Sequence, residues 1–173
     1  MIHGTEERAV VYTDGACMGR GRLRPGGYAA IILLGSREDI ITGRSLATTN
    51  TAMELMGVVE ALEALPPSIP VEIYSDSHYV IMGATKHLPW WRSRGWRIVK
   101  GGKVANKDLW QRLSLHLSGR SVTWNWVKGH SGDLHNERAH ALAYQEAQGA
   151  ARGILRDPGK NDRIPGMGVS GVE

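Results

Sequence analysis

The chain lacks the features of a secreted or membrane protein. A single cysteine, Cys17, excludes an intramolecular disulfide and any zinc cluster built from cysteines alone. No apolar run approaches the roughly 18 residues of a membrane-spanning helix, because the longest, residues 28–34, has the length of a strand. The N-terminal sequence MIHGTEER has no apolar stretch of the kind that a secretory signal needs. We therefore expect a cytoplasmic protein with no membrane association.

A second absence is local: residues 86–107 contain no Asp or Glu. The same segment holds seven Lys or Arg and three of the six tryptophans. The remaining chain has 14 basic and 17 acidic residues, so a body with a net charge of −3 carries one strongly basic segment. Cations beside aromatic rings are typical of a nucleic-acid binding surface. A solvated loop that tryptophan anchors to the core explains this pattern equally well.

The hydrophobic pattern predicts an α/β fold in one domain. The 173 residues suit one folded domain at 1–152 with a flexible tail at 153–173. Strands are predicted at 9–13, 28–34, 38–46, 71–76 and 121–127, and helices at 52–65, 77–86, 106–117 and 134–148. Short connections between the first three strands favour antiparallel neighbours, and helical crossovers favour parallel ones. The expected architecture is a five-stranded mixed sheet, three antiparallel strands plus two parallel ones, flanked by helices.

Three carboxylates occupy informative places in this scheme. Asp14 and Asp76 end the first and fourth strands, and if these strands are neighbours the crevice beyond them is a topological switch point. Glu54 begins the apolar stripe of the helix predicted at 52–65. Each alone has a structural explanation, as a cap or as a charge that the first helical turn stabilises. Together they would repel one another, and Mg²⁺ or Mn²⁺ would relieve that repulsion.

Six segments in order resemble type 1 ribonuclease H, and most closely the bacterial enzyme. They are YTDGAC (12–17), TTNTAMEL (48–55), YSDSHYV (74–80), RGW (94–96), NKDLWQRL (106–113) and VKGHSG…NER (127–138). The resemblance covers about residues 9–148. It implies a ribonuclease H-like fold and endonucleolytic cleavage of the RNA strand of an RNA/DNA hybrid, leaving 5′-phosphate and 3′-hydroxyl ends.

The resemblance also implies the catalytic set. Asp14, Glu54 and Asp76 match three of the family's four metal-binding carboxylates, and His130 matches a mobile histidine that aids proton transfer or product release. The fourth carboxylate position holds His140. Neutral imidazole binds Mn²⁺ more readily than Mg²⁺, so we expect activity with a stronger preference for Mn²⁺. Two ions are expected when substrate is bound. Position on the helix alone favours instead a buried structural histidine.

Substrate contacts are implied in the same way. The matching positions are Gly15 and Cys17 in the first loop, Thr49 and Asn50 before the first helix, His78, Asn106 in a phosphate pocket with Thr49, and Trp91, Trp96, Lys100 and Lys103 in a basic handle beside the DNA strand. Small polar groups at the sugar edge can recognise the RNA 2′-hydroxyls.

Several positions depart from the bacterial pattern, and other functions stay open. Arg20 replaces Asn beside an arginine-rich insertion, Thr51 replaces Asn, His78 replaces Gln and His87 replaces Trp. Because the fourth carboxylate is missing, a catalytically weakened hybrid-binding module is one alternative. Another nuclease of the same fold is a second. We expect a monomer without an obligate protein partner.

Overall fold

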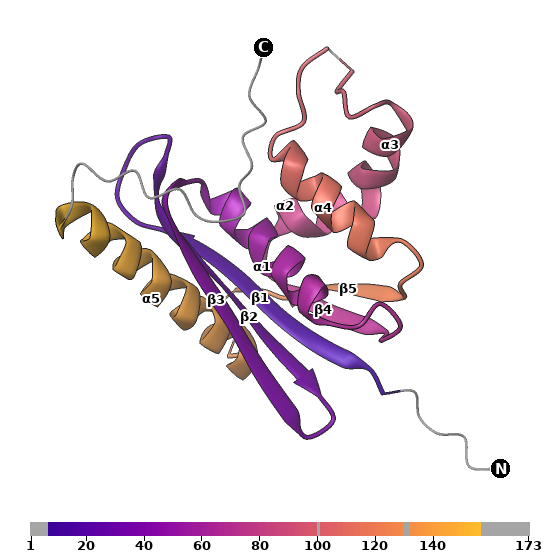
Figure 1. Ribbon diagram of the computed structural model, residues 1–173, viewed down its shortest axis with the longest axis horizontal. Helices are drawn as coiled ribbons and strands as arrows, with labels where there is room; N and C mark the ends of the chain where they lie inside the picture. The colour runs from indigo at the N-terminus through magenta and orange to yellow at the C-terminus, as the bar shows by residue number, and fades with distance from the viewer. Residues whose placement is uncertain (1–6, 100, 130–131, 157–173) are drawn as a thin grey trace.

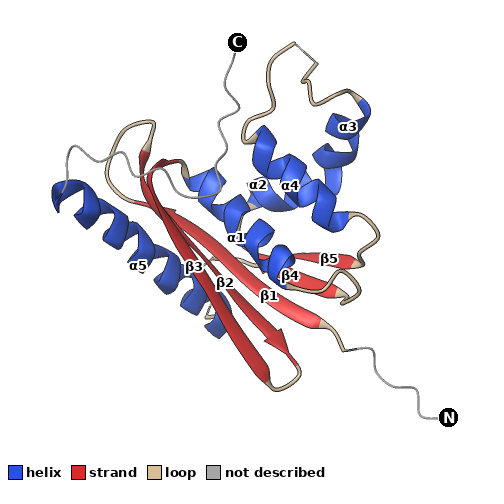
Figure 2. Ribbon diagram, in the orientation of Figure 1, coloured by secondary structure: helices blue, strands red, loops and turns tan. Residues whose placement is uncertain are grey.

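The computed structural model describes residues 7–99, 101–129 and 132–156, which form one mixed sheet with helices on both faces (Figures 1 and 2). The strands are β1 (Ala9–Cys17), β2 (Arg24–Leu34), β3 (Arg37–Thr48), β4 (Val71–Ser75) and β5 (Val122–Trp126). The helices are α1 (Asn50–Ala64), α2 (His78–Met82), the π-helical turn η1 (Gly83–His87), α3 (Leu88–Ser93), α4 (Lys107–Leu117) and α5 (Leu134–Arg156). None of the described helices is long and apolar enough to cross a membrane.

The sheet has the predicted mixture of strand directions. Its order is β3-β2-β1-β4-β5, with β1, β2 and β3 antiparallel and with β4 parallel to both β1 and β5. The expected five-stranded α/β architecture is therefore confirmed. The first and fourth strands are neighbours, as the switch-point argument required, and their parallel ladder ends at the pair Tyr12 and Tyr74.

Each face of the sheet has its own core. Alternate side chains of β1 point to opposite faces, so Val11 packs with α1 in the larger cluster while Ala16 faces α5. On the α5 face the contacts are made by small residues, including Ala143 and Ala147, both 0% exposed. A Cβ on Gly27 would lie 2.6 Å from the backbone nitrogen of Ala147, so only glycine lets α5 lie this close to β2.

The first strand is longer than predicted. We expected it to end at Asp14, but β1 continues to Cys17, and Gly15 pairs with Tyr28 of β2. The connection between β1 and β2 is therefore confined to residues 18–23. The physical reason is that β1 stays hydrogen-bonded to β2 as far as Cys17, whereas its pairing with β4 on the other edge ends at Tyr12. Asp14 lies at the switch point because the parallel pairing stops there, although the strand does not.

Two helical predictions were too short. The helix expected at 77–86 continues through η1 and α3 to Ser93, and a Cβ on Gly83 would lie 2.1 Å from the Trp110 ring. A π-turn at this glycine lets the helical run pass the indole. The helix expected to end at 148 continues to Arg156. Residues 153–156 are therefore helical, contrary to the predicted tail, while residues 157–173 lie outside the described part of the chain.

Candidate active site

Gly15 brings β1 into contact with the start of α1. A Cβ at this position would lie 2.2 Å from the backbone nitrogen of Glu54 and 2.5 Å from the carbonyl carbon of Met53. Gly57, one turn later in α1, also faces the sheet: a Cβ there would lie 3.1 Å from the carbonyl oxygen of Ala29 and 3.5 Å from that of Asp14. Since a side chain at residue 15 would push the helix away, glycine fixes the distance between Asp14 and Glu54. Gly15 itself is buried.

Glu54 is held from two directions. Asn50 Nδ2, one helical turn earlier, donates to Glu54 Oε1 at 2.8 Å, and Ser77 Oγ donates to Glu54 Oε2 at 2.5 Å. Ser77 also caps α2, because its Oγ accepts from the backbone N–H of Val80 at 3.2 Å. The inward orientation predicted for Glu54 is thus present, and both carboxylate oxygens are fixed by side chains of α1 and of the β4–α2 connection.

Asp76 follows β4 directly and is supported by residues of β5 and the loop after it. Trp126 Nε1 donates to the Asp76 carbonyl oxygen at 3.1 Å. The Trp126 indole also stacks on the exposed His78 imidazole, with ring centroids 4.7 Å apart. Gly129 passes so close that a Cβ there would lie 2.6 Å from Asp76 Oδ2. The loop that leads to His130 therefore begins against this carboxylate.

His140 reaches the same crevice from the opposite face of the sheet. Its Nδ1 lies 2.7 Å from Oδ2 of Asp14, whose other oxygen accepts from the backbone N–H of Gly15 at 2.7 Å. The Asp14 side chain is only 6% exposed, whereas that of His140 is 43% exposed. His140 is therefore not the buried structural residue that its helical position alone suggested.

The three carboxylates interact electrostatically. Burial raises the pKa of Asp14, and the negative charge of Asp76 raises it further, against the hydrogen bonds from His140 and Gly15 that lower it. Burial likewise raises the pKa of Glu54, the Ser77 hydrogen bond lowers it, and the charges of Asp14 and Asp76 add to the increase. Like charges at close quarters disfavour their own ionised forms. A cation in this crevice would offset the repulsion between the carboxylates that contributes to both shifts.

The donor chemistry of the crevice fits a hard divalent cation. Carboxylate oxygens prefer Mg²⁺ or Mn²⁺, and an imidazole nitrogen tolerates Mn²⁺ better. A pocket lined by Asp76, Asn136, Glu137 and His140 opens beside the carboxylates. Within the described ranges, no three His, Cys, Asp or Glu side chains are already gathered as a ligand cage. The carboxylates are instead held by the hydrogen bonds given above.

A polar network lies at the N-terminal ends of α1 and α4. Thr49 caps α1, its Oγ1 accepting from the backbone N–H of Ala52 at 3.2 Å, and lies 3.3 Å from Thr51 Oγ1. Asn106 Nδ2 donates to Thr51 Oγ1 at 3.4 Å and to the Tyr79 hydroxyl at 2.9 Å. Asn106 itself adopts a left-handed conformation, with φ 54°. The structure thus brings together Thr49 and Asn106, the two residues predicted to form a phosphate pocket.

The basic handle is tied to the core through tryptophan. The Trp91 ring lies 5.3 Å from that of the buried Trp110, and the backbone N–H of Trp96 donates to the Trp91 carbonyl at 2.8 Å. Lys103 is exposed and forms an isolated antiparallel bridge with Arg97. Both interpretations of this segment therefore hold in part: two tryptophans are partly buried anchors, and the cations remain exposed. Lys100 and His130 lie outside the described residues.

Four residues were not predicted to serve the site, and each supports a predicted member. Ser77 holds Glu54, Trp126 holds the backbone at Asp76, and Thr51 and Tyr79 both bind Asn106. Ser77 had a sequence signal, since serine after a strand is a good helix cap. Thr51 and Tyr79 lie in two of the family-like segments, but neither their contact with Asn106 nor that of Trp126 with Asp76 could be predicted, because these partners are distant in the sequence.

The comparisons with known proteins agree with this geometry. A family model, RNase H, matches residues 6–148. A Ribonuclease H from Caulobacter sp. (strain K31) is 46% identical over 136 residues, which cover 79% of this chain and 87% of that protein. A Ribonuclease H from Polaromonas naphthalenivorans is 48% identical over 139 residues, covering 79% and 85%.

A solved structure has the same arrangement of elements. The crystal structure of LC9-RNase H1, a type 1 RNase H with the type 2 active-site motif, superposes with a TM-score of 0.75 at 31% identity. The match covers 83% of this chain and 74% of that one. The likeness therefore extends over most of the sheet and helices described above.

Proposed function

Since this chain belongs to the ribonuclease H family, we propose that it is a metal-dependent endonuclease that hydrolyses the RNA strand of RNA/DNA hybrids. The products are 5′-phosphate and 3′-hydroxyl ends. The observation that carries the proposal is that the charges of Asp14, Glu54 and Asp76 act on one another near the switch point, with His140 Nδ1 2.7 Å from Asp14 Oδ2. A protein that only bound nucleic acid would gain nothing from carboxylates that repel phosphates.

Asp14, Glu54, Asp76 and His140 are the residues that would hold the cofactor, one or two Mg²⁺ or Mn²⁺ ions. Such ions supply an activated water and stabilise the leaving oxygen of the phosphodiester. The protein contributes orientation: Asn50 and Ser77 hold both oxygens of Glu54. Fixed carboxylates need little rearrangement when the substrate arrives.

The remaining predicted residues have supporting roles. His130 would take up or release a proton at the edge of the site, and Gly129 sets the start of its loop against Asp76. The network that includes Thr49 and Asn106 would receive a phosphate group. Asn50, Cys17 and His78 would contact the sugar edge of the substrate. Trp91, Trp96, Lys100 and Lys103 of the handle would lie along the DNA strand.

His140 sets the expected metal preference. A histidine in place of a carboxylate removes one negative charge from the site, so Mg²⁺ binds less tightly, while imidazole still suits Mn²⁺. Activity should therefore survive with Mn²⁺ favoured. The hydrogen bond from His140 to Asp14 keeps the imidazole beside the carboxylates, which supports a role in the site. A cytoplasmic monomer without an obligate protein partner remains part of this proposal.

The test is cleavage of an end-labelled RNA/DNA hybrid in Mg²⁺, Mn²⁺ or EDTA, with duplex RNA and duplex DNA as controls. We expect metal-dependent cuts in the RNA of the hybrid only, with loss of cleavage in Asp76→Asn. His140→Asp should raise the Mg²⁺ rate relative to the Mn²⁺ rate. His116→Asn is the matched control, because His116 contacts Glu63 on the far side of α1.

Two outcomes would change the proposal. Equal Mg²⁺ and Mn²⁺ rates in both the wild type and His140→Asp would remove the argument about metal preference. A wild-type protein that binds the hybrid without cutting it, while His140→Asp cuts, would show that the chain is a disabled nuclease. The hybrid-binding module would then be the better description.

A further inference from the structure

The loop between β1 and β2 carries a cluster of arginines that no step above uses. Residues 18–23 connect the two strands, and Met18 N–H donates to the Pro25 carbonyl at 2.8 Å to close the base of the loop. Arg20 and Arg22 are exposed, and Arg24 is half-buried at the start of β2. Three positive charges thus lie within five residues at one end of the sheet.

These arginines have no acidic partner within the ranges that the structure describes. The arginines that do form ion pairs there are Arg8, Arg37, Arg44, Arg112 and Arg138. The Nε of Arg24 is buried and has no hydrogen-bond partner among the described groups. A buried donor without an acceptor carries a free-energy cost. A ligand that brings anionic oxygens to this loop would remove that cost.

The cluster adjoins the candidate active site. Arg24 pairs in register with Thr48, the residue before the Thr49 cap of α1, and the strand irregularity between Arg24 and Gly26 lies here. Burial raises the pKa of the Cys17 thiol. The positive charge of Arg24 lowers that pKa, and the negative charge of Glu54 raises it. Arg24 therefore lies close to Cys17 and to the end of β3 that leads into Thr49, and both of these residues are assigned to substrate contact.

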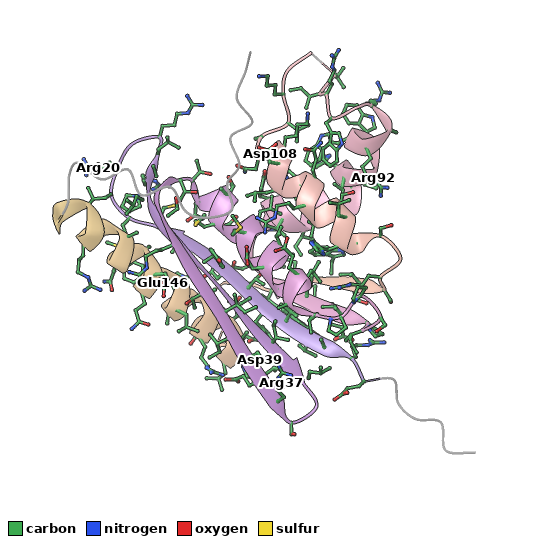
Figure 3. All side chains as sticks on the ribbon, in the orientation of Figure 1. Arg20, Arg37, Asp39, Arg92, Asp108 and Glu146 are labelled. Atoms are coloured by element: carbon green, nitrogen blue, oxygen red, sulfur yellow. The ribbon has the colours of Figure 1, made fainter. Side chains whose placement is uncertain are left out.

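The loop also faces the correct end of the molecule. In Figure 1 it projects from the same end as the N-terminus of α1 and the handle, on the other side of that helix. Figure 3 shows Arg20 at this end and Arg37 at the opposite end, beside the β2–β3 turn. An elongated polyanion bound across the N-terminus of α1 would reach the handle on one side and the arginine loop on the other.

We infer that residues 18–24, the loop and the first residue of β2, form a phosphate clamp separate from the pocket at Thr49 and Asn106. In this clamp Arg20, Arg22 and Arg24 bind phosphate groups of the RNA/DNA hybrid, on the side of the active site away from the handle. The inference rests on the proposed function. Arginine suits this task because its planar fork donates two parallel hydrogen bonds to phosphate oxygens. The clamp adds affinity that depends on salt and not on sequence.

The test is hybrid binding by fluorescence anisotropy in EDTA, where no cleavage occurs, using the whole chain. Each lost phosphate contact lowers the slope of log affinity against log salt by about 0.9. The affinity ratio of wild type to Arg20→Ala/Arg22→Ala should therefore shrink about tenfold between about 50 and about 200 mM salt. For Arg24→Gln the corresponding change is about threefold, and Arg24→Lys should recover most of it.

The matched control removes the same charge from the opposite end of the sheet. Arg8→Ala/Arg37→Ala loses two cations that are paired with Glu72 and Asp39. Its salt slope should equal that of the wild type. Slopes unchanged in both the double loop variant and Arg24→Gln, or an equal change in the control, would overturn the clamp. If Arg24→Gln fails to fold, the two exposed positions decide the question.

Failure of the clamp and failure of the proposed function give different results. A wild type that cuts the hybrid while the loop variants keep the wild-type salt slope refutes the clamp alone. A wild type whose binding depends on the loop, but which cuts nothing with either metal, refutes the proposed nuclease and retains the clamp. Inorganic phosphate that, at constant ionic strength, weakens wild-type binding more than it weakens the binding of the loop variants would further support it.

Discussion

Replacing Gly15 by alanine tests whether this glycine positions Glu54. The new Cβ would lie 2.2 Å from the backbone nitrogen of Glu54, where ordinary contact begins at 3.4 Å. The obstructing atoms belong to the backbone of α1, which cannot rotate away as a side chain could. The start of the helix must therefore move by about 1 Å, a displacement that can cost about 10²-fold in rate at a catalytic group.

The stability cost follows from the same clash. Overpacking a close-packed site costs about 1–3 kcal/mol, and a rigid backbone neighbour places Gly15→Ala at the upper end. For a protein of this size that corresponds to a fall in Tm of about 6–12 °C. Circular dichroism melting and hybrid cleavage at a temperature where both proteins are folded measure the two effects separately.

Gly153→Ala is the matched control. This glycine lies in α5, and a Cβ there would meet Leu46 at 3.6 Å, an ordinary contact. Alanine should stabilise the helix by about 0.5–1 kcal/mol, so the two substitutions are expected to change Tm in opposite directions. A Gly15→Ala protein with wild-type Tm and full activity would refute the argument that residue 15 sets the distance between β1 and α1.

Three further predictions concern the carboxylates. Burial and the charge of Asp76 raise the pKa of Asp14, so the folded protein in EDTA should become more stable as the pH falls through that raised pKa. Asp14→Asn should raise Tm at neutral pH and weaken this dependence of stability on pH. The same substitution should abolish cleavage. A lower Tm for this variant would contradict the repulsion argument. Ser77→Ala removes the 2.5 Å bond to Glu54 and the α2 cap, so denaturant unfolding should show a loss of about 1–2 kcal/mol. Trp126→Phe keeps an aromatic ring but loses the bond to the Asp76 carbonyl; we expect about a tenfold lower rate with little change in Tm, and an unchanged rate would argue against positioning.

The architecture could be predicted because its signals are local. Alternating apolar residues and short connections identify the three antiparallel strands, and longer crossovers identify the parallel ones. The three carboxylates could be proposed from the sequence because Asp14 and Asp76 follow apolar strands and Glu54 begins an apolar stripe. Boundaries were less accurate where tertiary contacts extend an element. β2 pairs with β1 as far as Cys17, and α5 still lies against β3 at Gly153, where a Cβ would lie 3.6 Å from Leu46.

The sequence by itself determined the order of the elements, the mixed sheet, the three carboxylates and the basic handle, because periodicity, charge and spacing are properties of neighbouring residues. Only the tertiary structure decided that Gly15 sets the approach of α1, that Ser77 and Trp126 support the carboxylates, and that His140 contacts Asp14. It also decided that Arg24 Nε is buried and has no hydrogen-bond partner among the described residues. These facts depend on distances of a few ångströms between residues far apart in the chain, and side-chain packing between layers sets such distances.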